Sequence, residues 1–85
     1  MPKFIIERNF ADKLELTKSD VDNVNRVNDD VGVRWIISFL SPDKKKTYCL
    51  YEAPTADAIR EAARRAGVPA DVITMVDEIG PNMFT

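Results

Sequence analysis

The side chains that could do acid–base or metal chemistry are few, because the 85-residue chain has no histidine and one cysteine. Two carboxylates, Glu7 and Glu52, fall inside strand-like segments. If buried, either could act as a general base or as a metal ligand, since burial raises the pKa of a carboxyl group. The more common arrangement for such residues is an exposed position near a strand end, or an ion pair with Arg8 or Arg34.

A second group of residues could line a pocket for a small molecule. Trp35 could form a pocket wall, although a single large aromatic more often lies at a subunit interface. Cys49 is most simply a small core residue, because the chain has no histidine to activate its thiol. The complete set of ligand-pocket candidates is Glu7, Trp35, Ile37, Cys49, Tyr51 and Glu52.

The apolar patterns along the chain predict a regular order of strands and helices, which would position these residues. An apolar run over 4–7 precedes a helix predicted over 17–31. Two strand-like runs, 33–40 and 46–53, then face each other across the turn residues Ser41, Pro42 and Asp43. An alanine-rich amphipathic helix and a last strand near 72–79 follow. The order predicts an α+β, ferredoxin-like βαββαβ fold, a four-stranded antiparallel sheet with two helices on one face, as one domain over 1–85.

The predicted helices have clear boundary signals. Thr17 and Thr55 are expected to be N-caps, and Gly67 is expected to end the second helix in the left-handed conformation. In the first helix, valines recur at three- and four-residue steps and form the buried stripe, which leaves Asn28 on the side expected to face solvent.

The strand over 33–40 predicts that the protein pairs with itself. Strict alternation would place Val33, Trp35, Ile37 and Phe39 on one face, and its other face also carries apolar residues. The two helices can cover only one of those faces, and a chain this short buries little core. A second copy of the chain is the simplest cover for the other face, so we expect a homodimer in the form of a dimeric α+β barrel. We expect an apolar inter-subunit cavity near Trp35, Ile37 and Tyr51.

Composition excludes several classes of partner. The formal net charge of −2 lacks the basic excess of a protein that follows nucleic-acid phosphates. The amino-terminal segment is too short and too charged for a signal-peptide core, and no apolar run reaches the length of a membrane span. We therefore expect a cytoplasmic protein that binds neither nucleic acid nor membrane.

Three stretches resemble a known family: the runs 35–39, 46–54 and 59–71. The most specific are the Tyr-Cys-x-Tyr-x-Ala-Pro pattern from Tyr48 and the Arg-Glu-x-Ala-x-Arg-x-Gly-x-Pro-Ala-Asp pattern from Arg60. They are similar to small bacterial nickel-binding-type proteins of unknown function, and the resemblance implies a homodimeric ferredoxin-like α+β barrel. It also implies histidines where this chain has Ile37 and Ala62. Because imidazole is the neutral side chain best suited to nickel, we expect no resident metal here, and a nickel site would have to use Cys49 or carboxylates.

The function expected from these observations is that of a small homodimeric binding protein, for a small molecule or a weakly bound metal. One alternative is a cofactor-independent enzyme of the oxygenase or isomerase kind, in which Glu7 or Glu52 acts as base and Tyr51 donates a hydrogen bond. Another is a structural or regulatory module that only dimerises.

Overall fold

The structure is a computed structural model that describes residues 1–84. It has the predicted order of strands and helices, with one added 3-10 turn. The elements are β1 (Lys3–Asn9), α1 (Lys18–Val31), β2 (Arg34–Leu40), β3 (Lys46–Glu52), α2 (Ala56–Ala66), β4 (Val72–Val76) and η1 (Pro81–Phe84). In this part of the chain, no helix is long and apolar enough to cross a membrane.

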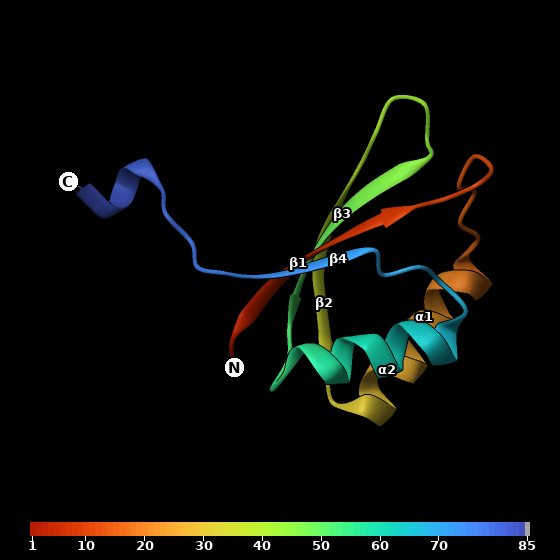
Figure 1. Cartoon of the computed structure of the whole chain (residues 1–85), viewed down its shortest axis with the longest axis horizontal. Helices are drawn as coiled ribbons and strands as arrows, with labels where there is room; N and C mark the ends of the chain where they lie inside the picture. Colours follow the sequence, from red (N-terminus) through yellow and green to blue (C-terminus); the bar gives the residue numbers. More distant parts are fainter. Residues whose placement is uncertain (85) are drawn as a thin grey trace.

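The four strands form one antiparallel sheet in the order β2-β3-β1-β4, which confirms the predicted ferredoxin-like α+β fold. Both helices lie on the same side of this sheet (Figure 1). The side beneath the helices is called the covered face below, and the opposite side the open face. The last strand is shorter than predicted, because the chain leaves the sheet after Val76 and extends away from the domain (Figure 1).

The helices begin and end at the predicted residues. Thr17 forms a capping box with Asp20: the Asp20 amide donates to Thr17 Oγ1 (3.2 Å), and the Thr17 amide donates to Asp20 Oδ2 (3.0 Å). Thr55 caps α2 through the Ala58 amide, and Gly67 follows α2 with φ 72°. These contacts satisfy backbone groups that a helix end would otherwise leave without partners.

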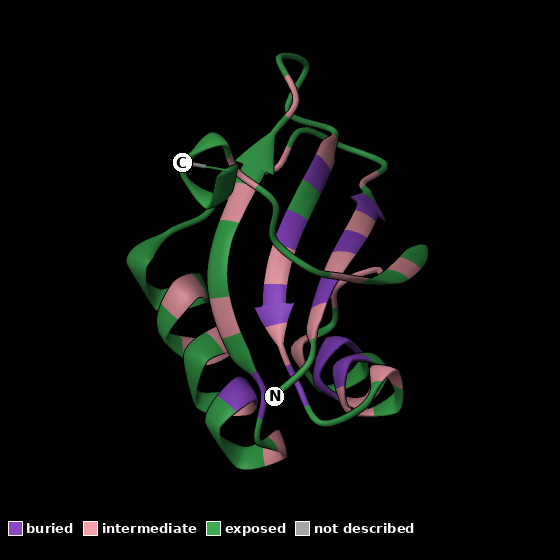
Figure 2. Ribbon diagram, turned by 90° about the vertical axis from the view of Figure 1, so that its left-hand side faces the viewer, coloured by how far each residue is buried: buried purple, intermediate pink, exposed green. Residues whose placement is uncertain are grey.

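The core lies between the covered face and the two helices. Ile6 from β1 and Ile59 from α2 are fully buried, and Phe4 and Tyr51 pack in the same cluster. Buried positions alternate along β1 and β3, as Figure 2 shows, because successive strand side chains point to opposite faces. Small alanines on the buried side of α2, Ala62 and Ala63, allow α1 and α2 to approach each other closely.

One strand departs from the predicted alternation. A β-bulge between Trp35 and Ile37 shifts the register of β2 against β3. Trp35 lies opposite Tyr51 on the covered face, whereas Ile37 and Phe39 lie on the open face. The expectation that Trp35, Ile37 and Phe39 share a face is therefore wrong, because the extra residue reverses the side of everything that follows it.

A second correction concerns Asn28, which we expected on the solvent side of α1 and which is only 5% exposed. It lies four residues after Val24 and three before Val31, so it falls within the buried stripe of the helix. An amide side chain is tolerated there because it has a polar partner, described below.

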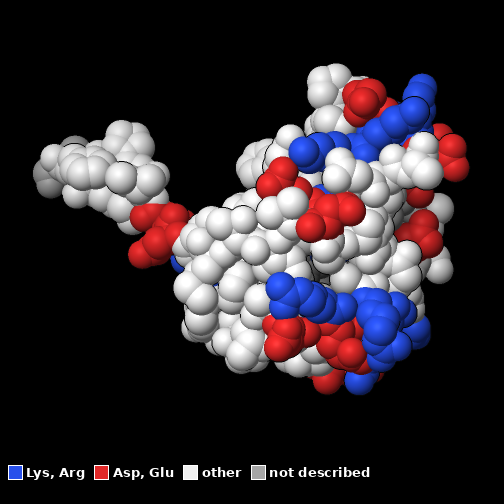
Figure 3. All heavy atoms as spheres, viewed as in Figure 1, with Lys and Arg blue, Asp and Glu red and all other residues white. Residues whose placement is uncertain are grey.

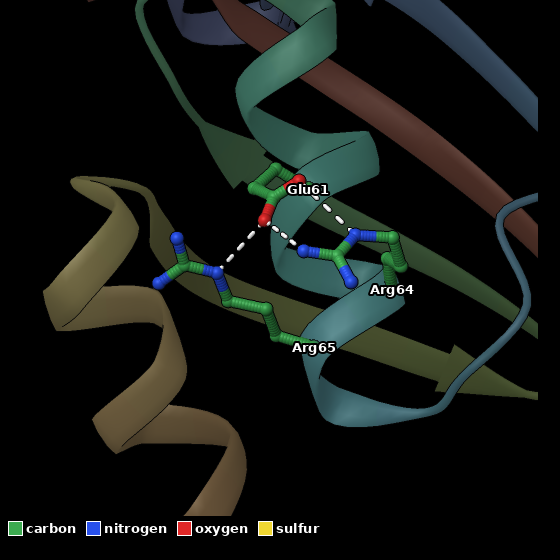
Figure 4. A network of polar contacts seen from close by, with 3 residues as sticks. All are labelled: Glu61, Arg64 and Arg65. Atoms are coloured by element: carbon green, nitrogen blue, oxygen red, sulfur yellow. Dashed lines mark hydrogen bonds and ion pairs between the residues drawn. The ribbon is translucent and has the colours of Figure 1, made fainter.

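Charged side chains are concentrated away from the core. They gather over the outer side of α2 and around the β2–β3 turn (Figure 3). On α2, Glu61 accepts hydrogen bonds from both Arg64 and Arg65, as the spacing of the three residues predicts (Figure 4). These two arginines hold the pKa of the Glu61 carboxyl at about 2.

Candidate functional site

An apolar pocket with a volume of about 80 Å³ opens between α1, the loop before it and the covered face of the sheet. Most of its apolar wall comes from three separate segments. The loop contributes Phe10, Leu14 and Leu16, helix α1 contributes Val21 and Val24, and β2 contributes Trp35.

The loop is held over the sheet by backbone hydrogen bonds. The Phe10 amide donates to the Lys45 carbonyl (2.8 Å), and the Leu14 amide donates to the Lys44 carbonyl (2.7 Å). Both acceptors belong to the β2–β3 turn, where Lys44 has φ 61°, a left-handed conformation that a tight turn imposes. The turn therefore fixes one wall of the pocket.

Arg8 is the one charged residue among those that line the pocket. Arg8 points to the covered face and is 6% exposed. Its Nη1 donates to the Pro69 carbonyl (2.5 Å), and its guanidinium carbon lies 5.7 Å from the centre of the Tyr51 ring. Among residues 1–84, no carboxylate lies within ion-pair distance of this arginine.

Tyr51 lies beside Arg8 and is 4% exposed. Its hydroxyl accepts a hydrogen bond from Asn28 Nδ2 at 3.4 Å, which is the partner that allows Asn28 to be buried. Burial raises the pKa of Tyr51, and the contact with Asn28 and the positive charge of Arg8 act in the opposite direction. The phenol is therefore neutral near pH 7 and keeps its proton available for a hydrogen bond.

The remaining polar groups of the pocket are already paired with each other. Cys49 Sγ lies 3.5 Å from Thr47 Oγ1, and Trp35 Nε1 donates to Ser38 Oγ at 2.8 Å. The indole is thereby fixed at the pocket wall, with its ring against the apolar space.

The open face carries the other predicted site residues. Glu7 forms an ion pair with Lys46 (3.2 Å), and Glu52 forms one with Arg34 (3.3 Å). Glu52 lies opposite Lys3 on β1, four residues from Glu7, so the two carboxylates are about 13 Å apart along the strands at about 3.3 Å per residue.

The structure thus divides the six candidates into two groups. Trp35, Cys49 and Tyr51 line the pocket on the covered face, whereas Glu7, Ile37 and Glu52 lie on the open face. Trp35 and Tyr51 lie on one face of the sheet and Ile37 lies on the other, so these three residues do not line one cavity within the chain. For the same reason the expected partnership of Glu7 or Glu52 with Tyr51 is not formed within one chain.

Sequence reasoning missed Arg8 as a pocket residue, although a signal was present. Arg8 alternates in phase with Phe4 and Ile6, both of which are buried. The wall formed by Phe10 and Leu14 was less predictable, because it depends on where the turn holds a loop without regular structure.

An antiparallel sheet in the order β2-β3-β1-β4, with two helices on one face and the other face open, defines a small ferredoxin-like α+β protein. Residues 4–76 match the family model described as nickel-responsive protein SCO4226-like, and the chain belongs to that family. The crystal structure of SCO4226 from Streptomyces coelicolor A3(2) is similar, with a TM-score of 0.70 and 23% sequence identity over 92% of this chain and 99% of that one. No curated protein sequence matches the chain.

The family description raises the question of whether these residues fit nickel. The chain has no histidine, and the described residues hold no group of three or more Cys, Asp and Glu side chains that could bind an ion together. Cys49 lies on the covered face, while Glu7 and Glu52 lie on the open face with cationic partners. Nickel favours imidazole and thiolate ligands in a compact set, so the donors of one chain do not fit this metal.

Proposed function

We propose that this protein binds a small molecule in the pocket under α1 and that it acts as a homodimer joined through the open face. The observation that carries the binding function is the pocket itself: an apolar space lined by a fixed tryptophan and by a few polar residues, Arg8 among them. Small-molecule sites have this composition, with mostly apolar walls and a few convergent polar groups that orient the ligand.

The proposed dimer is supported by the side chains that the open face leaves exposed. Phe39 is 60% exposed and Ile37 is 48% exposed, and both lie on the same face as Leu50 of the adjacent strand. At the ends of this apolar area, charged residues already have partners, as in the Glu7–Lys46 and Glu52–Arg34 pairs. An apolar centre with a polar rim is the pattern of a protein interface, and an isologous pairing of two copies is the simplest way to cover it.

Analytical ultracentrifugation tests the dimer. The expected mass is twice the 9.6 kDa of one chain, and Phe39→Asp is expected to give folded monomers. Met75→Asp is the matched control, because Met75 is 67% exposed but lies opposite Phe4, on the other face of the sheet. Wild-type protein that remains monomeric at micromolar concentration would contradict this part of the proposal.

Fluorescence tests the pocket, because Trp35 is the single tryptophan and lies in its wall. Short-chain alcohols and acids are expected to shift its emission in a saturable way. Val24→Phe should abolish that response by filling the pocket from α1, whereas Val72→Phe, on the open face, should not. A response that is equal in both variants would place the bound molecules elsewhere.

Calorimetry with Ni²⁺ separates small-molecule binding from metal binding. The donors of one chain lie on opposite faces of the sheet, so we expect no micromolar nickel affinity. Tight binding at one ion per dimer, lost in Phe39→Asp, would instead indicate a site assembled from two copies.

The same measurements decide the other candidate functions. A dimer whose pocket binds none of the probes would be a module that only dimerises. Turnover by a cofactor-independent enzyme would require a base close to Tyr51, and within one chain the sheet separates Tyr51 from both Glu7 and Glu52.

A further inference from the structure

The structure assigns a ligand class to this pocket: we propose that it binds a small organic carboxylate, whose charged end pairs with Arg8 and whose apolar end lies between α1 and the loop. This inference rests on the proposed small-molecule function. It specifies the charge of the ligand, the orientation of the ligand in the pocket and the size of the ligand.

The first support is the state of Arg8. Its guanidinium is buried, donates a hydrogen bond to one backbone carbonyl and lies over one aromatic ring. No carboxylate from the described part of the chain pairs with it. Other arginines of the molecule, such as Arg34 and Arg64, have a carboxylate partner although they are much more exposed. Removing a charge from water without a counter-ion is unfavourable, so a buried arginine of this kind favours binding of an anion.

The second support is the set of polar residues that line the pocket together with Arg8. Thr47 and Tyr51 lie on the strand next to Arg8, and Thr47 is directly opposite Arg8 in the register. None of the residues that line the pocket is acidic. A guanidinium flanked by hydroxyl groups offers several donors to a planar carboxylate, for which arginine is well suited.

The third support is the apolar remainder of the pocket, which distinguishes an organic acid from an inorganic anion. Leu14, Val21 and Val24 also line the pocket, and their side chains give phosphate or chloride no polar partner. Leu16, which also lines the pocket, is 52% exposed, so the outer part of the pocket reaches solvent.

The size of the pocket limits the ligand. An apolar cavity of about 150 Å³ holds benzene, so a space of about 80 Å³ holds about half as many carbons, which corresponds to the propyl part of butanoate. Longer chains would extend past Leu16 into water. Butanoate is therefore the natural probe.

The deciding experiment compares three probes of equal length on the native protein. Butanoate, butan-1-ol and butylammonium are titrated at pH 7 and constant ionic strength, with Trp35 fluorescence as the readout. Butanoate is expected to bind at least tenfold more tightly than the alcohol, and the ammonium ion more weakly than both.

The outcomes of this comparison are distinct. If the alcohol binds as tightly as butanoate, the carboxylate inference is wrong while the proposed small-molecule function stands. If none of the three probes binds, both are wrong. If phosphate competes with butanoate at equal concentration, the site recognises anions alone and the inference of an organic acid fails.

Substitutions test whether Arg8 is the positive charge that binds the carboxylate. Arg8→Met keeps the length of the side chain and should reduce butanoate affinity at least tenfold, with little effect on butan-1-ol. Arg34→Met, on the open face, is the matched control and should bind both probes as the wild type does. Butanoate should also raise the melting temperature of the wild type but not of Arg8→Met. If Arg8→Met does not fold, the comparison of the three probes on the native protein remains decisive.

Discussion

On the covered face of the sheet, Phe4 and Ile6 are buried and Arg8 has no carboxylate partner among the described residues. On the open face, Glu7 and Glu52 have cationic partners, and Ile37 and Phe39 are exposed. The same strands build both faces, because neighbouring residues in a strand point in opposite directions. Each face therefore lacks a different kind of partner. We propose a small organic anion as the partner of the covered face and a second copy of the chain as the partner of the open face.

Adjacent residues of β1 give the largest expected effect in this comparison. Ile6 is fully buried, whereas Ile5 is half-buried on the open face. Ile6→Ala should lower the free energy of unfolding by about 3 kcal/mol, because it leaves a cavity in the core. Ile5→Ala should cost less than half of that in dilute solution. Urea denaturation of both variants measures the difference, and equal losses would mean that the two faces are equally covered in the monomer.

The two tyrosines of β3 provide the next comparison, because they lie on opposite faces. Tyr51→Phe removes the hydroxyl that accepts from buried Asn28 and should cost about 1–2 kcal/mol. Tyr48 is 39% exposed, and Tyr48→Phe should change stability by less than about 0.5 kcal/mol. Thermal denaturation of the pair is sufficient, and a larger loss at Tyr48 would contradict the assignment of faces.

A smaller effect on stability is expected from the N-caps of the two helices, of which α1 lines the pocket and α2 does not. Thr17→Ala and Thr55→Ala each remove an N-cap and should each cost about 1 kcal/mol. Only α1 contributes side chains to the pocket, so only Thr17→Ala should also weaken the response of Trp35 to butanoate. Similar loss of binding in both variants would show that the pocket depends on overall stability and not on α1.

The smallest effect concerns Glu61, whose partners lie on the exposed side of α2. The pKa of Glu61 is about 2 in the folded protein against 4.5 as the ordinary value, so its stabilising contribution is complete above about pH 4.5 and is lost as the pH falls toward 2. Glu61→Gln should therefore melt at a lower temperature than the wild type at pH 6, and the difference should vanish near pH 2. High salt should reduce it as well, because the pairs are exposed to solvent. A difference that persists at pH 2 would exclude this ionic origin.

The fold was predictable from the sequence because its signals are local and mutually consistent. Thr17, Thr55 and Gly67 mark helix ends through short-range backbone contacts, and the apolar periods distinguish helices from strands without knowledge of the tertiary structure. The family resemblance pointed to the same architecture, and the family match over residues 4–76 agrees with it.

The candidate site was predicted only in part, because it depends on long-range placement. Trp35, Cys49 and Tyr51 line one pocket, but the prediction combined them with Ile37 across a bulge that the sequence does not reveal. The contact of Arg8 with the Pro69 carbonyl joins residues that are far apart in the sequence. Such contacts are set by how the elements pack, and strand alternation carries no information about them.

The bulge at β2 has a further consequence for how this protein tolerates change. Ile36 is the extra residue between Trp35 and Ile37, so its loss would leave those two as ordinary neighbours on opposite faces, and Ser38 and Phe39 would keep their sides. In a strand without a bulge, the same one-residue deletion would turn every following side chain to the other face. The surplus residue therefore lets β2 absorb a deletion that a regular strand of this sheet could not.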